Sequence, residues 1–184
     1  MERLPTRLDG PMLLAPPVHG DARGFLVESY RASTLRKLGV ADDFVQDNHS
    51  RSAYGVVRGM HFQVDPPAAK LVRCARGAVT DVVVDVRPGS STYGEWEAFE
   101  LTDENQRVLY VPVGFAHGFA VLSEVADVLY KQSAEWTPAA DRGIALDDPD
   151  IGIEWPVPPD DRIISERDRR APRLADIEAQ LAPG

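Results

Sequence analysis

The run from Gly77 to Arg87, GAVTDVVVDVR, constrains the fold more than any other part of the sequence. Its residues alternate in period two, as expected for a β-strand, in which successive side chains point to opposite faces. One face carries Val79, Asp81, Val83 and Asp85, and the other carries Thr80, Val82, Val84 and Val86. A helix would need a period of 3.6 residues, so this segment is predicted to be a strand.

Six further short runs have the same character, and turn signals such as VDPP, RPGSS and TDEN separate them. They are Gly24–Tyr30, Asp43–Ser50, Gly55–Phe62, Lys70–Arg76, Arg107–Val111 and Ala126–Ser133. Many short strands with little helix predict an all-β fold, a double-sheet jelly roll. The mouth of such a barrel can hold one small ligand.

Helix is expected in only two places. Ser33 or Thr34 is suited to cap a short helix that ends at Gly39. Pro172 is suited to open a terminal helix from about Arg173 to Leu181.

The bulk properties predict one domain, residues 1–184, long enough to bury a core. The net charge is −9 without a basic cluster, so neither nucleic acid nor an anionic membrane is an expected partner. No apolar run is long enough to span a bilayer, and the N-terminus lacks the apolar stretch of a secretory signal. The single cysteine, Cys74, suits a cytoplasmic protein, and its apolar surroundings predict a buried, inert thiol.

The four histidines, His19, His49, His61 and His117, give only part of a metal-binding pattern. Pro112-x-Gly114-x-x-His117 matches the second half of the motif of metal-binding jelly rolls, but His61 is followed by Phe-Gln rather than by x-His. A three-ligand site from His49, His61 and His117 stays open as an alternative, although the sequence favours a chain without metal. His117 itself is interpreted as a hydrogen-bonded core histidine.

His61 lies on an apolar strand in RGMHFQ and is either a core histidine or a base. Other predicted strands supply a cation, a phenol and neutral hydrogen-bonding groups, which proton abstraction beside a carbonyl requires. These are Lys70, Tyr130, Lys131, Gln46 and Asn48. Arg58 and His61 are three residues apart, so a regular strand would send them to opposite faces, unless a bulge at Gly59 re-aims one of them.

Several long motifs in the right order make the chain resemble the dTDP-4-dehydrorhamnose 3,5-epimerase family, whose members are metal-free cupins of the rhamnose pathway. The motifs are DARGFLVESY (21–30), QDNHSRSAYGVVRGMHFQ (46–63), KLVRCARGAVTDVVVDVRPGSSTYGEW (70–96), VPVGFAHGF (111–119), LYK (129–131) and ISERD (164–168). The resemblance implies a cupin jelly roll with short peripheral helices, without cofactor. It further implies a dTDP-linked 4-keto-6-deoxy sugar as the substrate.

The resemblance also implies the catalytic residues. His61 would remove the proton alpha to the C4 ketone, and Asp168 would bond the far nitrogen of its ring. Lys70 would hold the enolate oxygen, since a fixed cation at a developing charge lowers the barrier. Tyr130 would return a proton from the opposite face of the sugar, which is what inversion needs.

Substrate-binding residues and a dimer are implied in the same way. The residues matched to pyrophosphate and sugar binding are Arg58, Gln46, Asn48 and Arg167. Arg23, Phe25 and Glu28 match a segment that holds the nucleotide, partly across the interface of a homodimer formed by exchange of N-terminal strands. Arg23 and Glu28 could instead form ordinary surface ion pairs. Trp136 stands near the position of an aromatic that packs on the base, which is a looser match.

Four other functions stay open at this stage. Relatives with the same motifs invert only C3 or only C5 of the sugar. A cupin ketoisomerase and a metal-dependent cupin isomerase or dioxygenase are further enzymatic alternatives. A sugar-nucleotide binding module without catalysis is the alternative from another class.

Overall fold

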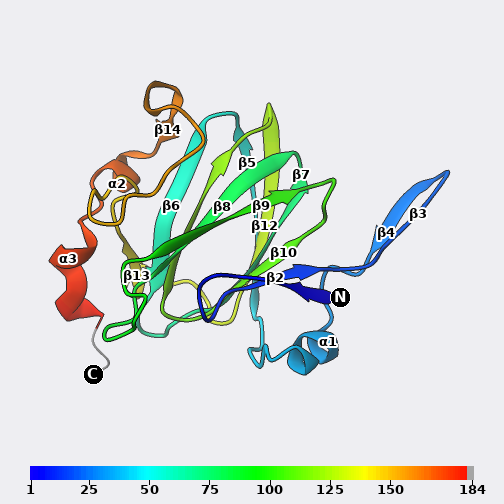
Figure 1. Ribbon diagram of the computed structural model, residues 1–184, viewed down its shortest axis with the longest axis horizontal. Helices are drawn as coiled ribbons and strands as arrows, with labels where there is room; N and C mark the ends of the chain where they lie inside the picture. Colours follow the sequence, from blue (N-terminus) through cyan, green and yellow to red (C-terminus); the bar gives the residue numbers. More distant parts are fainter. Residues whose placement is uncertain (182–184) are drawn as a thin grey trace.

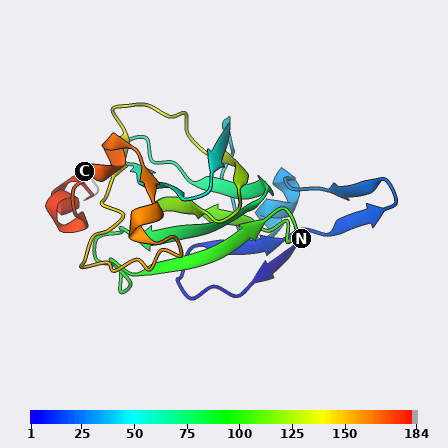
Figure 2. The same cartoon turned by 90° about the horizontal axis from the view of Figure 1, so that it is seen from above.

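A computed structural model of the chain describes residues 1–181, which fold into a double-sheet jelly roll (Figures 1 and 2). The first sheet has the order β1-β2-β10-β7-β12-β5, and the second has the order β13-β6-β11-β8-β9 with β14 beside β6. A two-stranded sheet, β3-β4, stands apart. The first sheet contains β1 (Glu2–Leu4), β2 (Met12–Ala15), β10 (Val108–Val111), β7 (Lys70–Arg76), β12 (Val125–Gln132) and β5 (Gln46–Ala53). The second contains β13 (Asp141–Gly143), β6 (Val56–Gln63), β11 (Phe115–Val121), β8 (Ala78–Asp85), β9 (Trp96–Thr102) and β14 (Ile163–Ile164).

All seven predicted strands are present, and β7 has the bounds that the sequence pattern indicated. The alternation did not reveal β11, whose seven residues are all buried, so that neither face shows a polar period. Strand β9 was also missed. Five further strands were missed because they have too few residues to show a period: β1, β2, β3, β13 and β14.

Strand β8 is buried on both faces, which explains its many valines. Val79 and Val83 pack between the two sheets. Val82 and Val84 pack against the C-terminal segment, including Trp155. Both faces of the second sheet are therefore covered. The barrel interior can contact a ligand only where polar side chains take the place of the valines.

Both predicted helices are present, but the cap of the first needs correction. Helix α1 (Ala32–Lys37) ends before Gly39 as expected, but its N-cap is Arg31, so Ser33 and Thr34 lie inside the helix. The backbone is extended at Arg31 and becomes helical at the next residue, so Arg31 is the N-cap. Helix α3 (Leu174–Ile177) continues as a 3₁₀ turn (Glu178–Gln180).

Helix α2 (Glu166–Arg169) and a 3₁₀ turn (Pro159–Asp161) were not predicted. Both are a single turn long, too short for a helical hydrophobic period to appear in the sequence. Figure 1 shows α2 and β14 lying along β6, at the side of the barrel opposite the β3-β4 hairpin.

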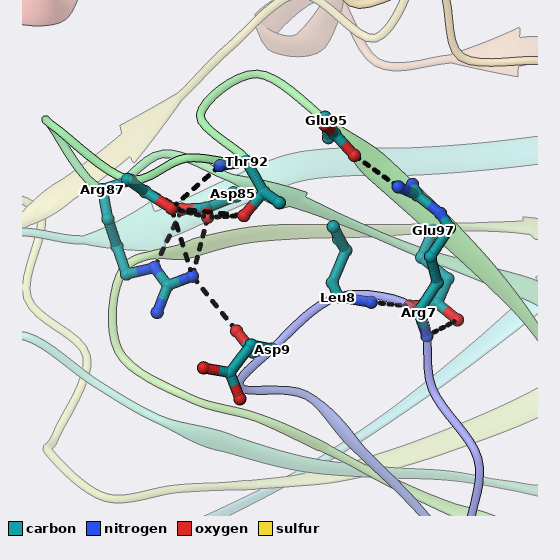
Figure 3. Close-up of polar contacts among 9 residues, drawn as sticks. Arg7, Leu8, Asp9, Asp85, Arg87, Thr92, Glu95 and Glu97 are labelled. Carbon is teal, nitrogen blue, oxygen red and sulfur yellow. Dashed lines mark hydrogen bonds and ion pairs between the residues drawn. The ribbon is translucent and has the colours of Figure 1, made fainter.

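The segment between β1 and β2 fastens the first sheet to the second (Figure 3). The Glu97 carboxylate accepts hydrogen bonds from the backbone N–H groups of Arg7, at 2.8 Å, and Leu8, at 2.9 Å. Arg87 donates to the carbonyl of Asp9 at 3.1 Å. The Leu8 side chain is buried in the core cluster between the sheets, so these bonds hold Leu8 in the core.

The hairpin of β3 (Val18–Asp21) and β4 (Gly24–Val27) projects from the barrel (Figure 1). It exposes the apolar side chains of Val18, Phe25 and Leu26, the last with 73% of its surface accessible. Exposed apolar side chains gathered on one arm of the chain are typical of a surface that binds another protein.

Two predictions from composition have structural outcomes. Cys74 is buried as expected, and burial raises the pKa of its thiol to about 11, so the thiol is protonated and inert at neutral pH. Among residues 1–181, no helix is long and apolar enough to cross a membrane.

Candidate active site

A cavity of about 520 Å³ opens between the inner face of the first sheet and strands β6 and β11. Its polar lining includes His61, Lys70, His117, Tyr130 and Arg58. Residues of β14 and α2 form one wall, among them Ser165, Arg167 and Asp168. The cavity therefore gathers side chains from strands that are far apart in the sequence.

The period of two along each strand brings these side chains inward. On β12 Val128 packs in the core between the sheets, so Tyr130 two residues later faces the same side. Tyr130 is paired in register with Asn48 of β5, and Gln132 with Lys70 of β7. Lys131 takes the other face, where its ammonium pairs with Asp47 at 2.9 Å, so it does not belong to the cavity.

A bulge at Gly59 puts Arg58 and His61 into the same cavity. His117 of β11 pairs with His61, and Phe119 pairs with Arg58, so between these pairs one residue of β11 lies opposite two residues of β6. Gly59 has φ +133°, and a Cβ there would come within 2.5 Å of the Gly118 Cα. Only glycine fits at this position, and the bulge that the sequence left open is present.

His61 and Asp168 form a close pair. The Nε2 atom of His61 lies 2.7 Å from Oδ1 of Asp168, and the side chains are 30% and 5% exposed, respectively. Burial raises the pKa of Asp168, but hydrogen bonds from His61, from Ser165 and from the Gly59 backbone N–H outweigh burial and lower it. An ionised Asp168 accepts a hydrogen bond from the Nε2–H group of His61, so the lone pair of the ring is on Nδ1.

Lys70 is almost fully buried in the wall of the cavity beside His61. Its ammonium donates to the backbone carbonyl of His61 at 3.0 Å. Burial lowers the pKa of Lys70 to about 8, although the carboxylates of Asp81 and Asp141 oppose the shift. A cation with few protein partners is thereby available to an oxygen of a bound ligand.

Tyr130 is half-buried on the opposite sheet from His61. Burial raises the pKa of its phenol, and Arg58 partly opposes this effect. The phenol is consequently protonated at neutral pH and can donate a proton. Arg58 is held by a bond from its Nε to the Ser52 hydroxyl at 3.1 Å.

Arg167 lines the same cavity, whereas Gln46 and Asn48 do not line it but lie on β5, the strand beside Tyr130. The Gln46 amide donates to Asn48 at 3.0 Å and accepts from the Trp136 backbone N–H at 2.7 Å. Arg167 pairs with Asp141 at 2.7 Å, and Asp141 also accepts from the Trp136 indole N–H at 2.9 Å. The sequence did not indicate Asp141, because β13 has only three residues and shows no strand pattern.

Arg23, Phe25 and Glu28 are not brought to the cavity within one chain. They belong to the projecting hairpin or the segment after it, and none of them lines the cavity around His61. Arg23 pairs with Asp21, and Glu28 pairs with Arg31. These are the surface ion pairs that the sequence left open as the alternative.

His117 forms a second histidine–aspartate pair deeper in the barrel. It is buried, and its Nε2 lies 2.9 Å from Oδ2 of Asp81, which fits the core histidine expected from the sequence. It also lines the cavity, which the sequence did not indicate. Burial lowers the pKa of His117, with the nearby Lys70 acting in the same direction.

The three-histidine site left open above is not assembled. His61 and His117 are cross-strand neighbours, but His49 lies on the exposed face of β5 and pairs with Asp127 at 3.2 Å. Within residues 1–181, no group of three or more metal-ligating side chains of the His, Cys, Asp or Glu type comes together.

Comparison with known proteins agrees with this fold and cavity. The family model described as dTDP-4-dehydrorhamnose 3,5-epimerase matches residues 5–176. The chain belongs to this family. A dTDP-4-dehydrorhamnose 3,5-epimerase of Methanothermobacter thermautotrophicus is 49% identical over 165 residues, which cover 89% of each chain.

Solved structures of epimerases have the same fold. The dTDP-6-deoxy-D-glucose-3,5-epimerase RmlC of Legionella pneumophila, in complex with dTDP-4-keto-L-rhamnose, superposes with a TM-score of 0.95 at 42% identity. It covers 99% of this chain, and this chain covers 97% of it. ChmJ, a 3'-monoepimerase from Streptomyces bikiniensis in complex with dTDP-quinovose, has a TM-score of 0.89 at 35% identity, with 97% and 91% coverage. The fold is therefore shared by epimerases that differ in the number of centres they invert.

Proposed function

We propose that the chain acts as a single domain that epimerises C3 and C5 of dTDP-4-dehydro-6-deoxy-D-glucose, giving dTDP-4-dehydro-L-rhamnose. Membership of the 3,5-epimerase family supports this function, as does the product that the Legionella relative binds. The observation that carries it is the His61–Asp168 pair beside the buried Lys70, because a base next to a fixed cation suits enolisation of a ketone.

Proton removal is the first step. Nδ1 of His61 takes the proton from the carbon beside the C4 ketone, and the electrons of that C–H bond move to the ketone oxygen. Asp168 stabilises the imidazolium through Nε2, and the Lys70 ammonium stabilises the enolate oxygen. The reaction needs no change of oxidation state, so the proposal includes no cofactor.

Reprotonation on the other face completes the inversion. The phenol of Tyr130 gives its proton to the enolate carbon, and the ketone forms again. The phenolate of Tyr130 then regains a proton from solvent. His61 releases to solvent the proton that it removed from the sugar. The raised pKa of Tyr130 suits a group that must be protonated when the enolate forms.

Substrate binding is assigned to two sets of residues. Arg58, Arg167, Gln46 and Asn48 bind the pyrophosphate and sugar, since they lie at or near the cavity and supply cations and amides. Arg23, Phe25 and Glu28 contact the nucleotide of a partner subunit in a homodimer formed by exchange of N-terminal strands. The projecting hairpin with its exposed Phe25 and Leu26 supports this part of the proposal.

Proton NMR of dTDP-4-keto-6-deoxyglucose with the chelator-treated protein in D₂O tests the function. We expect deuterium at both C3 and C5. Deuterium at one carbon only would favour a single-centre epimerase, a function that the shared fold of the 3'-monoepimerase makes the second candidate. Binding without any exchange would favour a binding module, and exchange that returns only with added metal would favour a metal-dependent cupin.

Replacement of Tyr130 by Phe separates the two half-reactions. We expect deuterium still to enter, because His61 and Lys70 are intact, while the configuration is largely retained, because the acid on the opposite face is lost. Product analysis by NMR coupling constants measures the configuration. Full inversion by Tyr130→Phe would contradict the role of Tyr130 as the acid.

A further inference from the structure

Two short helices near the C-terminus start with the same arrangement but use it differently. Both α2 and α3 carry an aspartate at the third helical position, Asp168 and Asp176. In a capping box, such a carboxylate accepts a hydrogen bond from the backbone N–H of the N-cap residue. Asp176 does so, accepting from the N–H of Arg173 at 3.3 Å. Asp168 instead directs its Oδ1 at His61, so its carboxylate is diverted from the helix to the cavity.

The diverted carboxylate leaves Ser165 as the side chain that caps α2. Its Oγ accepts from the Asp168 backbone N–H at 3.1 Å, and its carbonyl accepts from the Arg169 N–H at 3.0 Å. Directly before Ser165, β14 pairs in parallel with Val56 and Val57 of β6, the strand that carries His61. Ser165 is thus the joint between a segment fixed to β6 and the turn that carries Asp168.

We infer that Ser165 is a positioning residue, whose hydroxyl caps the turn that carries Asp168 and so keeps the Asp168 carboxylate against Nε2 of His61. The inference rests on the proposed role of His61 as the base. The Ser165 hydroxyl accepts from the Asp168 N–H through a lone pair, so its own proton is free to donate to the carboxylate. Together with the Gly59 N–H, this hydrogen bond lowers the pKa of Asp168 against the effect of burial.

Loss of the Ser165 hydroxyl changes the pKa of Asp168 in a definite direction. Without it the pKa of Asp168 rises, so at acidic pH a larger fraction of Asp168 is protonated and no longer stabilises the imidazolium. The other charged or titratable groups in the hollows next to Asp168 are His61 and Arg58 of β6, Lys70 of β7, His117 of β11, Tyr130 of β12, Asp141 and Arg142 of β13, Arg167 of α2 itself and Arg170 directly after it. Ser165→Ala removes none of these groups, so a shift of the acid limb reports on the coupled pair of Asp168 and His61.

Three variants test the inference by their pH profiles of deuterium exchange at the sugar. For Ser165→Ala we expect the acid limb of kcat to move to higher pH, with a KM within about twofold of the unmodified protein. Ser165→Thr retains a hydroxyl and should restore the profile. Asp176→Ala is the matched control, since it removes a helix cap that does not touch the cavity, and should lower Tm without moving the limb.

An unmoved acid limb in Ser165→Ala, or a limb that moves equally in Asp176→Ala, would overturn the inference. Absence of exchange in the unmodified protein would instead contradict the proposed function, and nitrogen NMR of the His61 ring would still test the positioning. We expect the Nε2–H tautomer in the unmodified protein and in Asp176→Ala, and a mixture of tautomers in Ser165→Ala. An unchanged tautomer in Ser165→Ala would overturn the positioning role.

Discussion

Two histidine–aspartate pairs, those of His61 and His117, lie on neighbouring strands of the barrel, and their surroundings differ although their contacts are alike. His61 and His117 face each other in register on β6 and β11, and their Nε2 atoms lie 2.7 and 2.9 Å from a carboxylate oxygen. The His61 side chain is 30% exposed, whereas that of His117 is 7% exposed. Contact with an aspartate therefore does not by itself distinguish a base from a structural histidine.

The origin of each aspartate explains the difference. Asp81 lies on β8, the strand next to His117, and one of its oxygens has no hydrogen-bond partner among residues 1–181. Asp168 comes from a helix outside the sheets and approaches His61 from the edge of the cavity. A carboxylate at the edge supports the ring while the other ring nitrogen stays accessible, whereas a pair inside the sheet is shielded.

Replacement of His61 by Ala is the largest expected effect. Loss of a general base costs about 10²–10⁴-fold in rate, so deuterium exchange at C3 and C5 should nearly vanish. Thermal unfolding should change little, since the ring is partly exposed. Strong exchange by this variant would contradict the proposed role of His61 as the base.

Replacement of Asp168 by Asn should have the next largest effect. The amide offers His61 a donor as well as an acceptor, so the ring tautomer is no longer fixed, and we expect a loss of roughly 10–100-fold in kcat. Substrate affinity, measured by calorimetry, should be nearly unchanged. A strongly active Asp168→Asn variant would remove the functional distinction between the two pairs.

The alkaline limb of the pH profile tests the role of Lys70, which lines the same cavity as His61 and His117. Its pKa is lowered to about 8, so the ammonium is present below that pH and is lost above it. We expect kcat to fall roughly tenfold per pH unit well above pH 8, because the enolate oxygen loses its cation. In Lys70→Arg the cation persists, so the limb should move to higher pH at reduced activity, and an unmoved limb would assign it to another group.

Replacement of His117 by Phe should act mainly on stability. The ring nitrogen that pairs with Asp81 is lost, and an unsatisfied buried group costs about 1–3 kcal/mol, or several degrees in Tm. His61→Phe serves as the matched control and should lower Tm less. An unchanged Tm together with loss of exchange in His117→Phe would show that the second pair is also catalytic.

The sequence predicted much of the fold but less of the site geometry. The seven strands with a visible period were found, whereas β11 was missed because both of its faces are buried. His61, Lys70 and Tyr130 were singled out because they interrupt apolar strands. Asp141 was missed because its three-residue strand carries no pattern.

The sequence by itself determined the seven strands that show a visible period, the face that most of their side chains take, and the family to which the motifs belong. A period of two is a local property of the backbone, so it is visible in the order of residues. The tertiary structure alone decided that Gly59 forms a bulge and that Arg23 and Phe25 lie away from the cavity. The contact of Asp168 with His61 across 107 residues was implied by the family resemblance, and the structure confirms it. These depend on which distant segments pack together, and no local period records that choice.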